Sequence, residues 1–396
     1  MPLIEKLRIG LCVYSLLLFS FVVNFIQIVA RPLDFIGARS LRLRITGFAC
    51  SALANTFIFW FEYISGTRVI ITGDELPPNE RVFLISNHLN VEWMHLVCLA
   101  ARYAPAGAFT GIFKASLKWL PIAWVGVLED HILVTKGASK SKTTKTLEQI
   151  KRGARKLCDD EKPLWLFMFP EGTWLAPGWD HVKTKANAFA AKNGFPPLHN
   201  VLFPRSAGFL AVLDEARRSV ETKYAGLDAL YDCTVAYANP YHPVKIGTAN
   251  PPSVLAFCAG AANAPREVHF HIKRYPLRPS LIEKESSSVP PTAGGEAERW
   301  LHTRFAVKKE GLLEHFEQHK CFPGVERTPL LAVKTMWAYQ LFLLHSLVLL
   351  LWLMRRIVGS VGTAVFLIAA AGMAILPATG DKNKRKQKPL PKAKAT

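Results

Sequence analysis

The chain of 396 residues lacks the signatures of several common protein classes. It has 7 cysteines, an odd number, and no two of them are spaced as Cys-x-x-Cys. Scattered cysteines of this kind indicate reduced thiols used mainly in packing. No Asn-x-Ser/Thr glycosylation sequence occurs, which is consistent with a cytosolic soluble part. A Gly-x-Ser-x-Gly nucleophile elbow is also absent, so chemistry through such a serine is not expected.

Negative charge is scarce as well. The chain has 30 acidic residues against 49 lysines and arginines, which gives a net charge of +19. The basic residues form neither repeats nor a patch interleaved with aromatics, and no zinc or RNA-binding signature accompanies them. Nucleic acid is therefore not the expected partner. An anionic membrane surface and a phosphate-bearing ligand fit the excess better.

Apolar residues are abundant, at 50% of the chain, and they gather in long runs near both ends. Ile9–Ala30 has the length of a membrane-spanning helix. A cleaved signal peptide is the alternative, but the run is too long and no small-residue cleavage site follows it. The basic residues after this run place that side in the cytosol. Phe48–Tyr63 could also span the membrane, but because it contains Asn55 and Glu62 we expect a helix lying in or re-entering the cytosolic leaflet.

Two further apolar runs near the carboxyl end are separated only by Arg355 and Arg356. We expect Met336–Met354 and Ile357–Leu376 to form a membrane hairpin with both outer ends in the cytosol. A re-entrant pair is the alternative, because no glycine or proline separates the two arginines. The predicted divisions are a membrane anchor (1–65), a soluble domain (66–330), the hairpin (331–380) and a basic disordered tail (381–396).

The soluble part alternates strand-like runs with helical patterns, which predicts an α/β fold. Gly111–Gly126 predicts a helix that ends at Pro121, with Lys114 and Lys118 on one face. Leu281–Glu298 predicts a flexible loop. The remaining predicted elements are strands at 69–72, 82–85, 132–134, 232–237 and 268–272, and helices from 91, at 140–156, around 183–192 and at 299–319.

Polar residues follow one of these strands in a pattern that suggests chemistry. His88 comes just after the run Val82–Ile85, and Glu92 lies four residues later at the start of a helix. A histidine with a carboxylate in reach is the minimal general base with an orienting partner. A surface or capping pair is the commoner alternative when such a pair is seen by itself.

Two other apolar runs end in a similar way. Leu164–Trp174 breaks at Pro170, and Val201–Phe209, which we also expect to contain a strand, is closed by a proline and an arginine. Open α/β sheets bind ligands at the carboxyl ends of their strands, so these segments are expected to meet. The residues concerned are Glu171, Gly172 and Thr173 in the first run and Pro204 and Arg205 in the second.

Together the three segments resemble the motifs of the glycerolipid acyltransferases, a family marked by His-x4-Asp, Phe-Pro-Glu-Gly-Thr-Arg and a later proline motif. The resemblance extends over most of the chain. Within the family, the sequence is most similar to the branch with a C-terminal membrane hairpin. It implies a glycerolipid-acyltransferase-type αβ domain flanked by N-terminal membrane helices and that hairpin. The other segments that carry it lie at 203–209, 231–237, 268–275, 300–302 and 322–324.

The resemblance implies transfer of a fatty acyl group from acyl-CoA to a lysophospholipid, foremost lysophosphatidate to give phosphatidate. His88 is implied as the general base and Glu92 as its orienting partner. The alternatives are a lysocardiolipin-type acceptor, a catalytically weak lipid-binding homologue and, third, a transporter. The family implies no metal and no cofactor beyond the acyl-CoA co-substrate, and the oligomeric state is left open. The residues implied to hold the acceptor are Glu171, Gly172, Thr173, Pro204, Arg205 and Lys114.

Two positions depart from the family pattern. Three residues, not four, separate His88 from its carboxylate partner, and that partner is Glu92 in place of an aspartate. Trp174 stands where the family usually has an arginine, so one phosphate-binding charge is missing. We expect the charge from one of four other residues: Arg205, Lys114, Lys183 or Lys185.

The tail ends with Lys392 and Lys394 five and three residues from the end of the chain. This spacing resembles the dilysine signal for retrieval to the endoplasmic reticulum, and a merely polybasic membrane-binding tail is the alternative. We therefore expect a multi-pass protein of the endoplasmic reticulum membrane with its catalytic domain in the cytosol.

Overall fold

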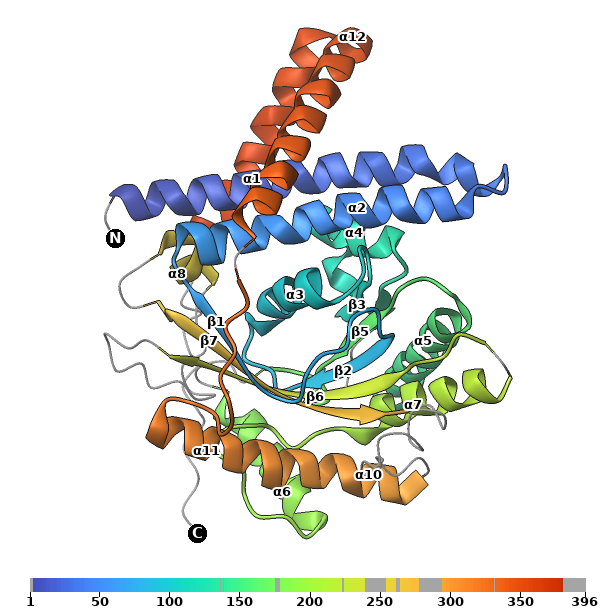
Figure 1. Cartoon of the computed structure of the whole chain (residues 1–396), viewed down its shortest axis with the longest axis vertical. Helices are drawn as coiled ribbons and strands as arrows, with labels where there is room; N and C mark the ends of the chain where they lie inside the picture. The colour runs from blue at the N-terminus through green and yellow to red at the C-terminus, as the bar shows by residue number, and fades with distance from the viewer. Residues whose placement is uncertain are drawn as a thin grey trace, which may run out of the picture.

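The computed structural model describes residues 3–379 except 136, 138, 175–178, 223, 239–253, 261–263, 278–293 and 331. Within these residues the chain forms one sheet with helices on both faces, which confirms the α/β class (Figure 1). The strands are β1 Arg68–Gly73, β2 Val82–Ser86, β3 Phe109–Lys114, β4 Ile132–Val134, β5 Trp165–Met168, β6 Ala229–Ala238 and β7 Glu267–Pro276.

The seven strands lie in the order β1-β7-β6-β2-β5-β3-β4. Strands β6, β2, β5, β3 and β4 run parallel, whereas β7 is antiparallel to β6 and parallel to β1. The carboxyl ends of β2 and β5 therefore lie next to each other at one edge. This arrangement brings together the segments that follow Ser86 and Met168.

Strand β2 is buried on both faces of the sheet. Val82 and Leu84 belong to one hydrophobic core, and Phe83 and Ile85 belong to the other. Because successive side chains of a strand point to opposite faces, a strand between two helical layers must be apolar at every position. This explains the unbroken apolar run that identifies β2 in the sequence.

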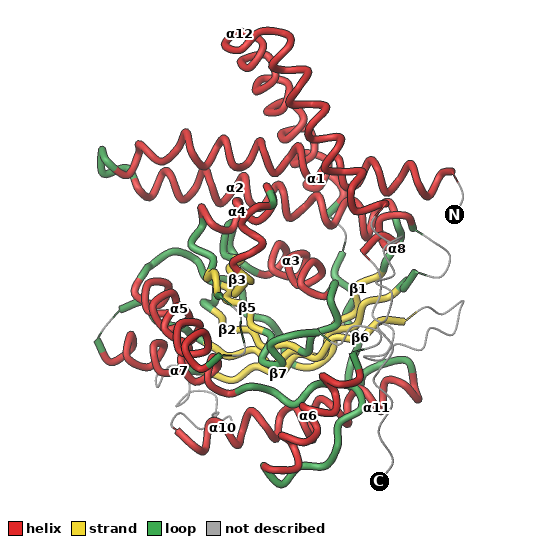
Figure 2. Tube along the Cα trace, turned by 180° about the vertical axis from the view of Figure 1, so that it is seen from behind, coloured by secondary structure: helices red, strands yellow, loops and turns green. Residues whose placement is uncertain are grey.

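Helices cover the two faces of the sheet in separate layers (Figures 1 and 2). The first core is covered by α1 Leu3–Ala30, α2 Arg39–Ile58, α3 Glu92–Tyr103 and α8 Val254–Ala259. The second core is covered by α5 Lys140–Asp159, α6 Asp180–Lys192, α7 Ser206–Glu221, α10 Gly294–Thr303 and α11 Glu310–His319.

The predicted helix at 299–319 is confirmed, with a π-helical turn, η4 Arg304–Lys309, between α10 and α11. The predicted loop Leu281–Glu298 lies largely outside the described residues, and its end, from Gly294, belongs to α10. Strand β7 contains the strand predicted at 268–272, and its Val268, Phe270 and Ile272 lie in the first core.

The predicted helix Gly111–Gly126 was wrong. The segment begins as strand β3, continues through the 3-10 turn η3 Ala115–Trp119, and enters helix α4 Pro121–Leu128. Pro121 is the first helical residue of α4, where the missing N–H costs nothing because no intrahelical acceptor is available there. The proline therefore starts a helix instead of ending one, and Lys114 and Lys118 share no helical face.

The long N-terminal helices α1 and α2 run side by side, farther from the sheet than α3 (Figure 1). Helix α1 is bound to α4 through polar side chains as well as apolar ones. Asn24 donates to the Pro121 carbonyl at 2.9 Å, and Gln27 donates to the Val125 carbonyl at 3.0 Å. The predicted helix at Phe48–Tyr63 is the end of α2 with the π-helical turn η2 Phe59–Ile64.

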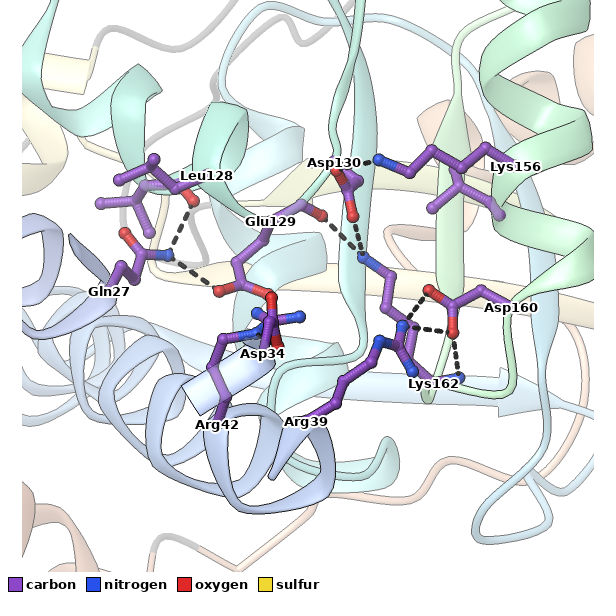
Figure 3. A network of polar contacts seen from close by, with 12 residues as sticks. Gln27, Asp34, Arg39, Arg42, Leu128, Glu129, Asp130, Lys156, Asp160 and Lys162 are labelled. Atoms are coloured by element: carbon purple, nitrogen blue, oxygen red, sulfur yellow. Dashed lines mark hydrogen bonds and ion pairs between the residues drawn. The ribbon is translucent and has the colours of Figure 1, made fainter. Parts of the chain in front are cut away.

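A network of charged residues fastens the same helix pair to the loops before β4 and β5 (Figure 3). The guanidinium of Arg39 donates to both oxygens of Asp160 at 2.7 and 2.6 Å. The buried Lys162 donates to the Glu129 carbonyl at 2.9 Å, and the Glu129 carboxylate accepts from Gln27 at 3.2 Å. These bonds fix the position of the helix pair relative to the sheet.

Two helices of the described chain are long and apolar enough to cross a bilayer: Leu3–Asp34, which includes α1, and Val333–Ser360. The second is the first part of α12 Val333–Thr379, which projects away from the sheet (Figure 1). Gly359 interrupts α12 with φ 78° and ψ 177°, a conformation essentially restricted to glycine.

Beyond the interruption, the chain returns to α1. The ring of Phe366 contacts that of Phe21 edge-on, with 5.0 Å between ring centroids. The pivot of the predicted hairpin is therefore Gly359 and not the pair Arg355 and Arg356, which lies within the helix.

This contact can be tested by cross-linking. Phe21→Cys together with Phe366→Cys should be joined by a short bifunctional maleimide, detected by mass spectrometry of the digested protein. Adding Gly359→Val should lower the yield, because a β-branched residue in this conformation costs about 1–3 kcal/mol. The control pairs Phe21→Cys with Val365→Cys, since Val365 is 59% exposed. Equal yields from both pairs would show that the chain does not return as described.

Candidate active site

The predicted pair His88 and Glu92 is in direct contact. His88 follows β2, and Glu92 is the first residue of α3. The Nδ1 atom of His88 lies 2.5 Å from Oε1 of Glu92, and the other carboxylate oxygen accepts a hydrogen bond from the Leu89 amide at 2.8 Å. With a carboxylate as acceptor, Nδ1 carries the imidazole proton and Nε2 keeps its lone pair. This is the tautomer that a general base requires.

The shorter spacing is accommodated by the backbone between the two residues. Asn90 has φ 89°, in the left-handed region that asparagine tolerates better than most residues. The turn at Asn90 brings the chain back within one residue fewer, and the longer glutamate side chain covers the remaining distance. The pair therefore forms despite the altered motif.

Neighbouring residues fix the plane of the His88 ring. The side-chain amide of Asn87 donates to the Val235 carbonyl at 3.0 Å and accepts from the Val235 amide at 2.8 Å, which extends the β2–β6 pairing by side-chain bonds. The ring of Phe169, which follows β5, stacks on His88 with 4.3 Å between centroids and 11° between planes. Neither residue was predicted from the sequence, although each flanks a recognised motif.

Glu171 joins two of the predicted segments to the histidine. Its side chain is buried, and Oε1 accepts from the His88 amide at 3.0 Å while Oε2 accepts from the Leu202 amide at 3.2 Å. Burial raises the pKa of the Glu171 carboxyl well above its usual value, and the two amides oppose that change. One carboxylate thus links the loops after β2 and β5 with the segment that leads to α7.

Arg205 lies beside the turn that follows Glu171. Gly172 has φ 72°, and a Cβ placed there would come within 3.6 Å of Cδ of Arg205. The Arg205 amide donates to the Pro170 carbonyl at 2.8 Å, directly before the first turn of α7. Its exposed guanidinium makes no hydrogen bond or ion pair to any part of the chain that is described. A cation and the amides of a helix N-terminus here suit a phosphate.

The other predicted residues occupy different positions around this edge. Pro204 is buried, and the hydroxyl of Thr173 donates weakly to the Trp174 carbonyl at 3.4 Å. Lys114 is exposed at the end of β3, two strands from β2. Lys183 donates to the His199 carbonyl at 3.2 Å, whereas Lys185 is exposed on α6.

The strand predicted within Val201–Phe209 was wrong. Val201, Leu202 and Phe203 are buried, but they have irregular backbone and belong to no strand. Their amides need other acceptors, because a buried N–H without a partner is costly. Carboxylates supply them, as the Leu202 amide bound to Glu171 illustrates.

A buried ionic cluster on β6 was also missed. Lys309, which is 0% exposed, and Arg304 each lie 2.5 Å from a carboxylate oxygen of Asp232. Burial alone would raise the pKa of the Asp232 carboxyl, but the two cations lower it below its usual value. The only available signal was an aspartate inside an otherwise apolar strand. Among the described residues, no group of three or more His, Cys, Asp or Glu side chains could hold a metal ion.

The chain is similar in sequence to known acyltransferases. A family model described as "Acyltransferase" matches residues 68–222, and one described as "Acyltransferase C-terminus" matches residues 262–343. The "Lysocardiolipin acyltransferase 1" of Gallus gallus is 31% identical over 263 residues, 66% of this chain and 61% of that protein. The "Probable 1-acyl-sn-glycerol-3-phosphate acyltransferase 5" of Arabidopsis thaliana is 34% identical over 271 residues, 67% of this chain and 61% of that protein.

The match thus spans 61% of the length of each of these two relatives. Among solved structures, the "1-acyl-sn-glycerophosphate (LPA) acyltransferase, PlsC, from Thermotoga maritima" is 14% identical, with a TM-score of 0.42. That match covers 78% of this chain and 97% of that one.

The turn at Asn90 yields a prediction. Asn90→Val should lower the free energy of unfolding by about 1–2 kcal/mol, because a β-branched residue is strained in the left-handed region, whereas Asn90→Gly should change it little. Chemical denaturation of the detergent-solubilised protein measures the difference. Labelling with diethyl pyrocarbonate should modify His88 faster in the valine variant. If valine and glycine are tolerated equally, the left-handed turn is not needed to close the pair.

Proposed function

The chain belongs to the glycerolipid acyltransferase family, and from this premise we propose that it transfers a fatty acyl group from acyl-CoA to a free hydroxyl of a lysophospholipid. The observation that carries the proposal is the close pair of His88 and Glu92 at the sheet edge that also holds Arg205. The thioester supplies the leaving group, so the protein must provide a general base and a cation that binds the acceptor phosphate.

In the proposed reaction, Nε2 of His88 takes the proton from the acceptor hydroxyl as its oxygen attacks the thioester carbonyl carbon. The tetrahedral intermediate collapses, the carbon–sulfur bond breaks, and the leaving thiolate takes the proton from the imidazolium. Glu92 holds the ring through Nδ1 and stabilises its positive charge between these steps. The burial of Glu92 keeps this carboxylate away from competing water.

The acceptor phosphate is proposed to lie at Arg205, whose planar guanidinium can bind it through two hydrogen bonds. The backbone at Gly172 and Thr173 and the first turn of α7 would contribute amides. Glu171 would orient the acceptor indirectly, by joining the His88 segment to the one that carries Arg205. Pro204 would restrict the backbone before the arginine, and Lys114 would add positive charge from the end of β3.

We favour lysophosphatidate as the acceptor, with phosphatidate as the product. The two similar relatives described above carry different acceptors in their names, so a lysocardiolipin-type acceptor is the second candidate. A panel of lysophospholipids assayed against one acyl-CoA separates the two. A catalytically weak lipid-binding homologue is less well supported, because the shortened motif still places the carboxylate 2.5 Å from the imidazole.

We further propose a multi-pass protein of the endoplasmic reticulum membrane, with the catalytic domain in the cytosol. The two candidate spans support membrane attachment. So do Trp119, Leu120 and Trp124, which are 76%, 50% and 48% exposed beside α1, since aromatic residues favour the bilayer interface. The retrieval signal proposed at Lys392 and Lys394 lies outside the described residues.

His88→Ala should lower acyl transfer about 100- to 10,000-fold, the usual effect of losing a general base. The assay follows a radiolabelled acyl group from acyl-CoA into phosphatidate in membranes that contain the protein. His319→Ala, at an exposed position on α11, is the control and should retain activity. Activity of the His88 variant within a few-fold of the unaltered protein would remove His88 from the mechanism.

Arg205→Ala should raise the KM for lysophosphatidate and leave the KM for acyl-CoA nearly unchanged. Arg205→Lys should recover only part of the loss, because an ammonium group cannot form the paired hydrogen bonds of a guanidinium. Arg152→Ala removes an exposed arginine of α5 and serves as the matched control for net charge. A change confined to the KM for acyl-CoA would reassign Arg205 to the donor.

A further inference from the structure

The segment from His199 to Leu202, which is buried from Asn200 onward, directs four consecutive backbone amides at two carboxylates. Glu310 accepts from the amides of His199 at 2.7 Å, Asn200 at 2.9 and 3.1 Å, and Val201 at 3.2 Å. Glu171 accepts from the next amide, that of Leu202, at 3.2 Å. The two carboxylates thus accept the hydrogen bonds that a neighbouring strand would otherwise accept from this segment.

The two carboxylates come from distant parts of the chain. Glu171 follows β5, whereas Glu310 is the first residue of α11, 110 residues beyond Asn200. The part of the chain matched by the "Acyltransferase C-terminus" model therefore contacts, through Glu310, the segment that leads to Arg205. It is a contact that joins the two family-model regions.

Glu310 is held rigidly by the residue before it. Lys309 is 0% exposed, lies 2.5 Å from the Asp232 carboxylate, and donates to the Cys233 carbonyl. Both residues sit where the π-helical turn η4 passes into α11, and such turns are often found at functional sites. Strand β6 thereby fixes the start of α11, and α11 fixes the segment at 199–201.

Arg205 lies only three residues beyond Leu202, and its backbone is fixed on both sides. The amide of Arg205 is bound to the Pro170 carbonyl at 2.8 Å. The ring of Pro204 restricts the backbone directly before the arginine. Residues 201–204 are all buried, so the segment has little room to absorb a displacement at 199–201 before it reaches the side chain of the arginine. The guanidinium would move relative to His88, whose amide is held by the same Glu171.

We infer that Glu310 is a positioning residue for the acceptor phosphate, because its bonds to the amides of His199, Asn200 and Val201 set the place of the Arg205 guanidinium. This inference rests on the proposed function and extends it to a residue that does not touch the substrate. Burial raises the pKa of the Glu310 carboxyl above its usual value, and the three amides oppose that change.

The test compares Glu310→Gln with Glu314→Gln, which alters an exposed glutamate one turn along the same helix. The side-chain NH2 group of glutamine is a donor, and it would face backbone N–H groups that need an acceptor. Glu310→Gln should raise the KM for lysophosphatidate about tenfold or more, and it should leave the KM for acyl-CoA within about twofold. Glu310→Asp keeps both oxygens and should recover part of the acceptor KM. Glu314→Gln should change neither KM.

A role limited to stability predicts a different result. Glu310→Gln would then lower the amount of active protein but leave both KM values as they are, and that outcome would overturn the inference. An equal rise in both KM values would also overturn it. If Glu310→Gln does not fold, the milder Glu310→Asp variant decides, since it should still raise the acceptor KM alone.

A separate measurement remains valid if the unaltered protein transfers no acyl group. Glycerol 3-phosphate should protect Arg205 from modification by phenylglyoxal, and Glu310→Gln should raise the protecting concentration about tenfold. Hydrogen exchange at the amides of 199–201 should also accelerate in that variant. Unchanged protection would overturn the inference, whereas absence of acyl transfer alone would count only against the proposed reaction.

Discussion

The site depends on buried carboxylates that bind backbone amides. Glu92 takes the Leu89 amide while it holds His88, and Glu171 takes one amide from each of two segments. A buried carboxylate without partners is strongly unfavourable, so each of these side chains stays in place only while its amides do. The loops at the sheet edge are thereby fixed by side chains where no strand partner exists, and the functional groups inherit that rigidity.

The elements that could be predicted from the sequence are those whose cause is local. Strand β2 was predicted correctly, because burial on both faces requires a continuous apolar run. Gly111–Gly126 could not be read correctly, because Pro121 looks the same whether it ends one helix or begins another. The hairpin was recognised from hydropathy, but its pivot at Gly359 depends on one backbone conformation.

The candidate site divides in the same way. His88, Glu92 and Glu171 could be proposed because they lie in short segments after strands that resemble the motifs of a known family. Nothing near Val201 in the sequence indicates that its amide is bound by Glu310, a residue 109 positions later. A buried apolar run without a strand partner has the same local appearance as a strand, so tertiary contacts alone distinguish the two.

The turn at Asn90 shows that the chemistry requires a geometry, whereas a sequence motif specifies only a spacing. The proposed reaction needs an imidazole nitrogen next to a carboxylate oxygen, and a chain can satisfy that with different numbers of intervening residues. Here a lost residue is offset by one left-handed asparagine and one additional methylene group. A pattern that demands a histidine, four residues and an aspartate would pass over this chain. Searches of sequence collections with that pattern should therefore miss members in which loop length and side-chain length have changed together.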